Sequence, residues 1–133
     1  MPQNKLNQFK YLVVDDDNMA SDLIGSTLNH LGAQQIVFAE DGPNALRLAQ
    51  QQRPDFILLD LYLPEEDGWV LLDQLRRVAP QAAVVMVTGS LLTSDFMQSM
   101  EQRVDGYCIK PVMPDVMEKA LVNARKRKSA AKA

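Results

Sequence analysis

The sequence has a single cysteine, no long apolar run and no nucleotide-binding motif. It contains a single cysteine, Cys108, so no internal disulfide can form, and the apolar neighbours of this cysteine predict a small buried side chain. Its longest apolar runs are far shorter than the roughly 18 to 20 residues that a membrane-spanning helix needs. It also offers neither an aromatic slot nor a glycine-rich phosphate loop for a nucleotide. These absences predict a soluble cytoplasmic protein with no membrane contact.

What is present is the composition of a folded domain. The chain has 133 residues, of which 47% are hydrophobic and 23% charged, and this is the size of a single domain. Five of its 14 basic residues lie in the segment 125–133, so residues 1–124 carry a net charge of −8, which argues against nucleic acid as a partner of this chain alone. We therefore divide the chain into an N-terminal extension at 1–9, one domain at 10–124, and a basic tail at 125–133 that is a solvated helix end or a linker stub.

Short apolar runs recur along the chain and lack the polar alternation of a half-exposed strand. Such runs are typical of strands covered on both faces, as in a parallel sheet. Segments of helical period lie between them. Gly32 closes the first of these segments, and Asp41-Gly42-Pro43 opens the second with a proline suited to a first helical turn. The predicted strands are 11–14, 36–39, 56–59, 83–87 and 107–109, and further helices are predicted within 69–76, 93–100 and 114–121.

Strands that alternate with helices in this way predict an α/β fold of the type (βα)5, with helices on both faces of one doubly wound, five-stranded parallel sheet. In the common version the strand order is 2-1-3-4-5, and ligands bind beyond the carboxyl ends of strands 1 and 3, where the winding reverses. The first strand leads into Asp15, Asp16 and Asp17, and the third leads into Asp60. The topology therefore predicts that carboxylates far apart in the sequence share one crevice.

The predicted crevice is acidic enough to need a compensating charge. Two carboxylates about 4 Å apart repel each other by roughly 4 kcal/mol at an effective dielectric constant of about 20, which is a large part of a small domain's stability. A raised carboxyl pKa, an ammonium partner or a hard divalent cation would each offset this repulsion. Because the available ligands are oxygens, with no histidine or cysteine beside them, the site favours Mg²⁺ over zinc or copper.

Two further groups follow strands of the same edge. The fifth predicted strand leads into Lys110 and the fourth ends at Thr88, so an ammonium and a hydroxyl join the carboxylates. This combination suits phosphoryl transfer, in which positioning and charge neutralisation do most of the catalysis. One carboxylate can then act as the nucleophile and carry an acyl phosphate. The plainer alternative is a set of solvated loop acids that bind no metal.

Four motifs, taken in order, are similar to those of a known family. They are VVDDDN after the first strand, LLDLYLPEEDG after the third, VTG after the fourth and GYCIKP across the fifth. Over about residues 10–124 the sequence resembles the receiver domain of two-component response regulators, the phosphorelay proteins of bacteria. The resemblance implies the flavodoxin-like fold of that family and a phosphoprotein that carries an aspartyl phosphate.

The resemblance implies a role for each matching acidic position. Asp15 and Asp16 correspond to the acidic pair that organises Mg²⁺, with Asp17 as a variable neighbour. Asp60 corresponds to the phosphoacceptor, which is also a metal ligand. The backbone carbonyl of Tyr62 corresponds to the third protein ligand of the metal.

The resemblance also implies groups that respond to phosphorylation. Lys110 corresponds to the lysine that pairs with the phosphoryl group, and Thr88 to the hydroxyl that turns toward it. Tyr107 corresponds to the aromatic switch residue that follows Thr88 inward, and a strand aromatic that is merely packed is the alternative. Pro111 matches a proline that the family holds in a cis peptide.

The sequence departs from the family pattern in several places, among them Leu63, where methionine is usual, and Met113, where a polar helix cap is usual. Arg103-Val104 replaces the common Gly-Ala, so the turn that leaves the fourth helix is expected to differ. Tyr62 and Ser90 stand two residues beyond Asp60 and Thr88, where the family tunes the lifetime of the phosphoryl group. A bulky tyrosine at this position is expected to hinder an attacking water.

We expect a phosphorylation switch, not an enzyme. A histidine kinase or a histidine phosphotransfer protein donates to Asp60, and the face formed by the fourth helix, fifth strand and fifth helix repacks for a downstream protein target. We expect a monomer or a phosphorylation-dependent homodimer.

Several alternatives to this stand-alone regulator stay open. The chain is also compatible with a receiver piece of a longer regulator whose output domain is absent, or with a scaffold that is not phosphorylated. An aspartyl-nucleophile phosphatase of the haloacid-dehalogenase kind requires a second aspartate where Tyr62 stands.

Overall fold

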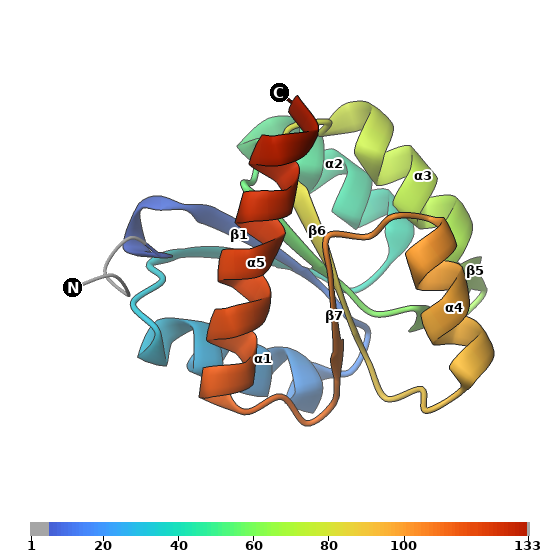
Figure 1. Cartoon of the computed structure of the whole chain (residues 1–133), viewed down its shortest axis with the longest axis horizontal. Coiled ribbons are helices and arrows are strands. Elements are labelled where there is room, and N and C mark those ends of the chain that lie inside the picture. The colour runs from blue at the N-terminus through green and yellow to red at the C-terminus, as the bar shows by residue number, and fades with distance from the viewer. Residues whose placement is uncertain (1–5, 133) are drawn as a thin grey trace.

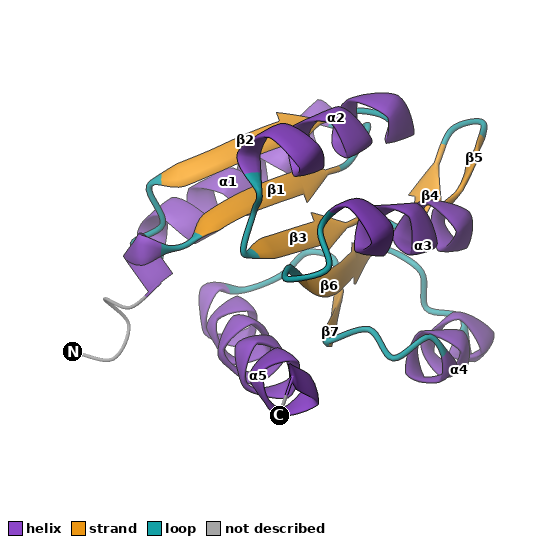
Figure 2. Ribbon diagram, turned by 90° about the horizontal axis from the view of Figure 1, so that it is seen from above, coloured by secondary structure: helices purple, strands orange, loops and turns teal. Residues whose placement is uncertain are grey.

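The computed structural model describes residues 6–132, so parts of the predicted segments 1–9 and 125–133 lie outside the described residues. Helices cover both faces of a central sheet (Figures 1 and 2). Within the described range, no helix is both long and apolar enough to cross a membrane. The elements in chain order are β1 (Lys10–Val14), α1 (Asn18–His30), β2 (Gln35–Ala39), α2 (Gly42–Gln52), β3 (Phe56–Leu59), β4 (Tyr62–Leu63), β5 (Glu66–Asp67), α3 (Gly68–Val78), β6 (Ala83–Thr88), α4 (Thr93–Glu101), β7 (Gly106–Ile109) and α5 (Pro114–Lys132).

The main sheet has five parallel strands in the order β2-β1-β3-β6-β7. Counted along the chain, this is the order 2-1-3-4-5, so the predicted doubly wound fold and its strand order are confirmed. Strand β1 lies at the centre of the reversal, where Val13 pairs with Phe38 of β2 on one side and with Leu58 of β3 on the other. The carboxyl ends of β1 and β3 therefore border the crevice in which ligands of such sheets bind.

Alternate residues of each strand enter two separate hydrophobic cores. On β1, Tyr11 and Val13 belong to the core under α1 and α5, whereas Leu12 and Val14 belong to the core under α2 and α3. All four residues of β3 are buried in the same alternating way. Because both faces of the sheet are covered, the strands have continuous apolar runs, and each buried aliphatic side chain contributes about 1.5–3 kcal/mol relative to its exposed state.

Aspartates begin three of the helices. The side chains of Asp17, Asp41 and Asp67 each accept a hydrogen bond from a backbone N–H in the first turn of α1, α2 and α3, respectively. These bonds satisfy donors that have no partner within the helix. At the other end of α1, Gly32 has a φ of 102°, a conformation that glycine adopts without steric cost, and this confirms the predicted end of the first helix.

A small antiparallel hairpin of β4 and β5 follows β3 and was not predicted. Its strands have two residues each, which is too short for a periodic pattern in the sequence. The Glu66 carboxylate accepts the backbone N–H of Gly42 at 2.7 Å, so the hairpin is tied to the start of α2. A Cβ atom at Gly42 would lie 1.8 Å from Glu66 Oε1, so a larger residue there would displace this contact.

The turn that leaves α4 is built around Arg103, which has a left-handed φ of 58°. The N–H of Val104 donates to the carbonyl of Ser99 at 3.2 Å, as in a Schellman cap, where glycine is the usual left-handed residue. The guanidinium of Arg76 on α3 donates to the carbonyls of Gln102 at 2.6 Å and Arg103 at 2.8 Å. The last carbonyls of this helix region are thus satisfied by a side chain from another helix.

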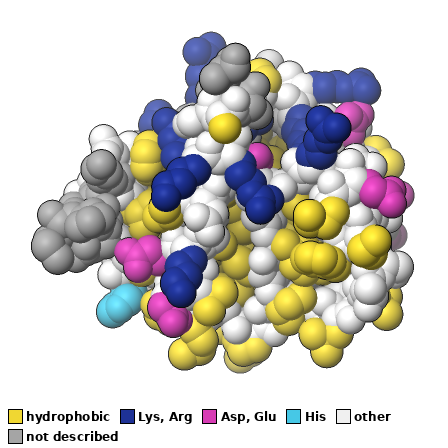
Figure 3. All heavy atoms as spheres, viewed as in Figure 1, with side chains coloured by type: hydrophobic (Ala, Val, Ile, Leu, Met, Phe, Trp, Pro, Cys, Tyr) yellow, Lys and Arg dark blue, Asp and Glu magenta, His cyan; other side chains and the backbone are white. Residues whose placement is uncertain are grey.

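Helix α5 continues through the basic segment to Lys132. The guanidinium of Arg125 lies over the ring of Phe9, 4.7 Å from its centroid, and this contact joins α5 to the segment before β1. Figure 3 shows Lys and Arg side chains along α5 and hydrophobic side chains over α4. The exposed hydrophobic residues of α4 and of the loop before it are Leu91, Leu92, Phe96, Met97 and Met100.

Candidate functional site

Four strands lead into the polar residues that the sequence analysis placed at one edge of the sheet. Backbone hydrogen bonds continue the sheet beyond the strand ends. The N–H of Asp15 donates to a carbonyl of β2 at 3.0 Å, and the N–H of Asp60 donates to the carbonyl of Val14 at 2.9 Å. The N–H of Lys110 donates to the carbonyl of Thr88, also at 2.9 Å. The sheet therefore fixes the backbone of Asp15, Asp60 and Lys110 at its edge.

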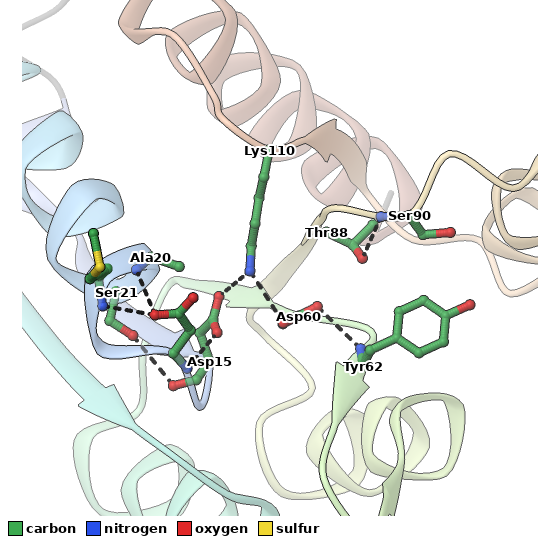
Figure 4. A network of polar contacts seen from close by, with 10 residues as sticks. Asp15, Ala20, Ser21, Asp60, Tyr62, Thr88, Ser90 and Lys110 are labelled. Carbon is green, nitrogen blue, oxygen red and sulfur yellow. Dashed lines mark hydrogen bonds and ion pairs between the residues drawn. The ribbon is translucent and has the colours of Figure 1, made fainter.

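The structure brings the predicted carboxylates together. Oxygens of Asp15, Asp16 and Asp60 lie within 4.8 Å of one another, and we call these three residues the acidic cluster. The Lys110 ammonium reaches between two of them, 2.5 Å from Asp15 Oδ2 and 3.2 Å from Asp60 Oδ2 (Figure 4). Asp15 and Asp60 are buried, whereas Asp16 is exposed. The Lys110 ammonium thus compensates the charge of the two buried carboxylates of the acidic cluster.

Asp17 has a different role from the two acids before it. One of its carboxylate oxygens accepts the N–H of Met19 at 2.9 Å and that of Ala20 at 3.4 Å, at the start of α1. Its own N–H donates to Asp15 Oδ1 at 3.0 Å. In the run of three acids, one therefore pairs with lysine, one stays open to solvent and one caps a helix. A role for Asp17 in capping was not predicted from the sequence.

Burial and charge shift the protonation equilibria of the site. Burial raises the pKa of the Asp60 carboxyl above its ordinary value of 3.8, against the opposing effects of the Tyr62 backbone N–H and the Lys110 charge. Burial alone would lower the pKa of the Lys110 ammonium. Its hydrogen bond to Asp15 and the charge of Asp60 outweigh burial, so the pKa of Lys110 lies above its ordinary value. The ionised form of Asp60 is therefore less stable in the folded protein than in water, and a bound cation would stabilise it.

The donor set of the acidic cluster fits a hard divalent cation. It consists of carboxylate oxygens that converge from two strand ends, and the exposed Asp16 leaves one side open to the waters that Mg²⁺ usually keeps. The N–H of Tyr62 donates to Asp60 Oδ1 at 3.1 Å, which holds the Tyr62 backbone beside the cluster. The assignment of its carbonyl as a metal ligand stays a prediction.

The predicted switch residues lie on the β6 and β7 side of the site. Thr88 is fully buried, and its hydroxyl oxygen accepts the N–H of Ser90 at 3.2 Å. The ring of Tyr107 packs edge-on against Phe96 of α4, with ring centroids 5.4 Å apart. Within the described residues the buried Tyr107 hydroxyl has no hydrogen-bond partner. Burial, followed by the charge of Asp95, raises the pKa of this hydroxyl. The switch roles of Thr88 and Tyr107 stay predictions.

Asp95 is a residue of this region that the sequence analysis missed. It is buried in the first turn of α4, and its carboxylate accepts hydrogen bonds from the hydroxyls of Tyr62 and Ser90. The hydrogen bond to Asp95 raises the pKa of the Tyr62 hydroxyl. An acidic residue in a first helical turn is common because it suits the helix dipole, so the sequence carried no specific signal for this contact.

The chain is similar in sequence to a family model and to curated proteins. The family model described as response regulator receiver domain matches residues 11–122. The chain is 36% identical over 104 residues to the DNA-binding dual master transcriptional regulator RpaA of Synechocystis, a match that covers 77% of this chain and 43% of that protein. The chain thus spans less than half the length of this curated relative.

Solved structures agree with the sequence relatives. A response regulator receiver domain protein from Clostridium thermocellum is 25% identical, with a TM-score of 0.81 over 92% of this chain and 98% of that chain. A response regulator protein from Burkholderia pseudomallei, solved with a phosphorylated aspartic acid, a calcium ion and citrate, is 26% identical. It has a TM-score of 0.78 over 92% of this chain and 72% of that chain.

Proposed function

Because this chain belongs to the response regulator receiver domain family, we propose that it is a phosphorylation switch in which Asp60 accepts a phosphoryl group from a histidine kinase or a histidine phosphotransfer protein. The observation that supports this most directly is the Lys110 ammonium between Asp15 and Asp60. Lys110 lies at a strand end beside two buried carboxylates, so its ammonium can pair with a negatively charged group that is added to Asp60.

The proposed transfer is a displacement at phosphorus. An oxygen of Asp60 forms a bond to phosphorus while the bond from phosphorus to the imidazole nitrogen of the donor breaks, and that nitrogen keeps the electron pair. Lys110 pairs with a phosphoryl oxygen in place of Asp60 Oδ2, from which it lies 3.2 Å. The acidic cluster and the Tyr62 carbonyl are the groups that would hold Mg²⁺, which when bound offsets the negative charge of the phosphoryl oxygens.

The output of the switch is proposed to be a change of the surface formed by α4, β7 and α5. Thr88 connects the site to this surface, because its carbonyl accepts the N–H of Lys110 at the end of β7 and its hydroxyl accepts the N–H of Ser90 before α4. Tyr107 lies on β7 against α4, and its buried hydroxyl has no partner among residues 6–132, a cost of about 1–3 kcal/mol that favours a second position of the ring. A downstream protein or a second copy of the chain would read this surface.

Two other functions, a phosphatase and a scaffold that is never phosphorylated, can be distinguished from the switch by one experiment. An aspartyl-nucleophile phosphatase needs an acid or base to activate water, and Tyr62 stands where a second aspartate would be required. A scaffold that is never phosphorylated does not need the lysine and carboxylates that meet here. The relative from Synechocystis is named as a DNA-binding transcriptional regulator, but the match covers 43% of its length, so a role in transcription is not part of the proposal for this chain.

The test uses a small acyl phosphate donor with Mg²⁺. The phosphorylation switch predicts stoichiometric labelling of the wild type that is absent from Asp60→Asn. Continuous release of inorganic phosphate at a high rate would favour the phosphatase, and the absence of any label would favour the scaffold. A phosphotransfer profile against purified histidine kinases then identifies the donor.

A further inference from the structure

Asp95 joins two segments that follow Asp60 and Thr88 in the chain and flank the proposed phosphorylation site. Its Oδ2 atom accepts the hydroxyl of Ser90 at 2.5 Å, and the hydroxyl of Tyr62 donates to the same oxygen. Tyr62 stands two residues after Asp60, at the start of β4, and Ser90 stands two residues after Thr88, in the loop before α4. We call Asp95, Tyr62 and Ser90 the Asp95 clamp.

The clamp is linked to the site by backbone hydrogen bonds at both ends. The N–H of Tyr62 donates to Asp60 Oδ1 at 3.1 Å, and the N–H of Ser90 donates to Thr88 Oγ1 at 3.2 Å. The chain of bonds thus runs from the phosphoacceptor through the clamp to the site hydroxyl. Figure 4 shows the Tyr62 ring directed away from Asp60 and from Lys110. The backbone of Tyr62 is therefore beside the reacting carboxylate while its ring is held to one side.

A carboxylate that only served the dipole of α4 would not need this arrangement. Asp95 is 8% exposed, and burial of a carboxylate is costly unless hydrogen bonds compensate it. Both compensating donors come from the segments that follow Asp60 and Thr88, and neither comes from the first turn of α4 itself. Hydrogen bonds to an ionised acceptor are about twice as strong as neutral ones. They are strong enough to hold a tyrosine that is 54% exposed in one orientation.

We propose that Asp95 is a positioning residue that holds the Tyr62 ring away from Asp60 and so keeps the phosphoacceptor open to both the phosphodonor and water. The inference rests on the proposed function of Asp60. It also changes the expectation for Tyr62: the bulky ring hinders attack on the phosphoryl group only when it is released from Asp95.

The size of the effect follows from the rotamers of Tyr62. A released ring distributes over the three staggered χ1 positions, and if one of them leaves Asp60 open, access falls about threefold. Access limits both the arrival of a small donor and the attack of water. Labelling and loss of label therefore both slow by about threefold, whereas the affinity for Mg²⁺ is unchanged because the acidic cluster is not altered.

The test compares rates of labelling by a small acyl phosphate and of hydrolysis of the aspartyl phosphate. Asp95→Asn and Tyr62→Phe each weaken or remove the hydroxyl contact but keep the ring, so each slows both rates about threefold. The double variant is no slower than either one alone. Tyr62→Ala has no ring to release, so its rates do not respond to Asp95→Asn. Asp73→Asn, on the exposed face of α3, is the matched control with wild-type rates.

Different results separate this inference from the proposed function. A wild type that takes no label overturns the proposed function and this inference with it. A wild type that is labelled on Asp60, with Asp95→Asn at wild-type rates or with an equal effect of Asp95→Asn in the Tyr62→Ala background, overturns the positioning role alone. In the unphosphorylated protein, nuclear Overhauser contacts between the Tyr62 ring and the β protons of Asp95 are expected, and their absence also overturns it.

Discussion

The ammonium nitrogen of Lys110 lies 3.2 Å from Oδ2 of Asp60, although 50 residues of chain separate them. The same nitrogen lies 2.5 Å from Asp15. One cation thus balances two buried carboxylates that come from different strands. The stability of this edge of the sheet consequently depends on a charge that phosphorylation is proposed to redirect.

Removal of that charge should destabilise the protein when no metal is present. We expect Lys110→Met to lower the free energy of unfolding by about 1–3 kcal/mol in metal-free buffer, because it leaves buried ionised acceptors without a partner. Mg²⁺ should recover most of the loss. Urea unfolding with and without Mg²⁺ measures both quantities, with Lys119→Met on the exposed side of α5 as the control. An equal loss in both buffers would contradict the charge-balance account.

Asp60→Asn should stabilise the metal-free protein at neutral pH. Since burial raises the pKa of Asp60 in the folded state, the folded protein binds this proton more tightly than the unfolded chain does. Stability is therefore lost as the pH rises from 3.8 through the raised value, and it stays lost at pH 7. Thermal unfolding should give Asp60→Asn a higher Tm than the wild type at pH 7, with a gap that closes as the pH falls below 3.8. A gap that widens in acid would contradict this sign.

Substitutions of the adjacent residues Asp16 and Asp17 should affect different properties, Mg²⁺ affinity for Asp16 and stability for Asp17. Asp17→Ala removes the N-cap of α1 and should cost about 1 kcal/mol of stability with little change in Mg²⁺ affinity. Asp16→Ala removes an exposed member of the acidic cluster and should weaken Mg²⁺ binding with little change in stability. Titration calorimetry and urea unfolding of both variants provide the comparison. Loss of Mg²⁺ affinity in Asp17→Ala alone would reverse the assignment.

Arg103→Gly should make the protein more stable. Arg103 adopts a left-handed φ of 58°, which costs a residue with a Cβ about 1 kcal/mol relative to glycine. The hydrogen bonds from Arg76 are unaffected because Arg103 contributes its backbone carbonyl. Arg47→Gly, inside α2, is the control of opposite sign and should lose about 1 kcal/mol. Chemical denaturation of the two variants should therefore move the midpoint in opposite directions.

The Cys108 thiol should be inert in the folded protein. Burial raises its pKa to about 11, so at pH 8 about one thiol in a thousand is ionised. A thiol-reactive chromophore should give no rapid signal with the native protein and one equivalent after unfolding in guanidinium chloride. Rapid reaction of the native protein at pH 8 would show that this side chain is reached by solvent more often than its 3% exposure implies.

The fold could be predicted because its signal is distributed over many residues. The run from Phe56 to Leu59 is apolar at every position since both faces of β3 are covered, and this distinguishes it from a surface strand. Once the sheet is parallel and doubly wound, the positions of Asp15, Asp60 and Lys110 at one edge follow from topology alone. The proximity of Asp15, Asp60 and Lys110 could therefore be predicted from the sequence.

The remaining features depend on side-chain conformations that carry no periodic signal. Asp16 and Asp17 are chemically identical neighbours, and only the direction of each carboxylate separates the cluster member from the helix cap. The contact between Tyr62 and Asp95 spans 33 residues and requires one rotamer of each. The turn at Arg103 keeps a left-handed conformation without glycine, and the hydrogen bonds from Arg76 of α3 that stabilise it have no signal in the sequence around Arg103.

The pairing of Lys110 with Asp15 joins positions 95 residues apart, at opposite ends of the domain. During synthesis the ribosome releases the carboxylates of β1 and β3 long before it releases this lysine. A nascent chain therefore has both carboxylates but lacks the ammonium that balances them. The charge of the two buried carboxylates is therefore compensated only after β7 has docked beside β6 and brought Lys110 to this edge.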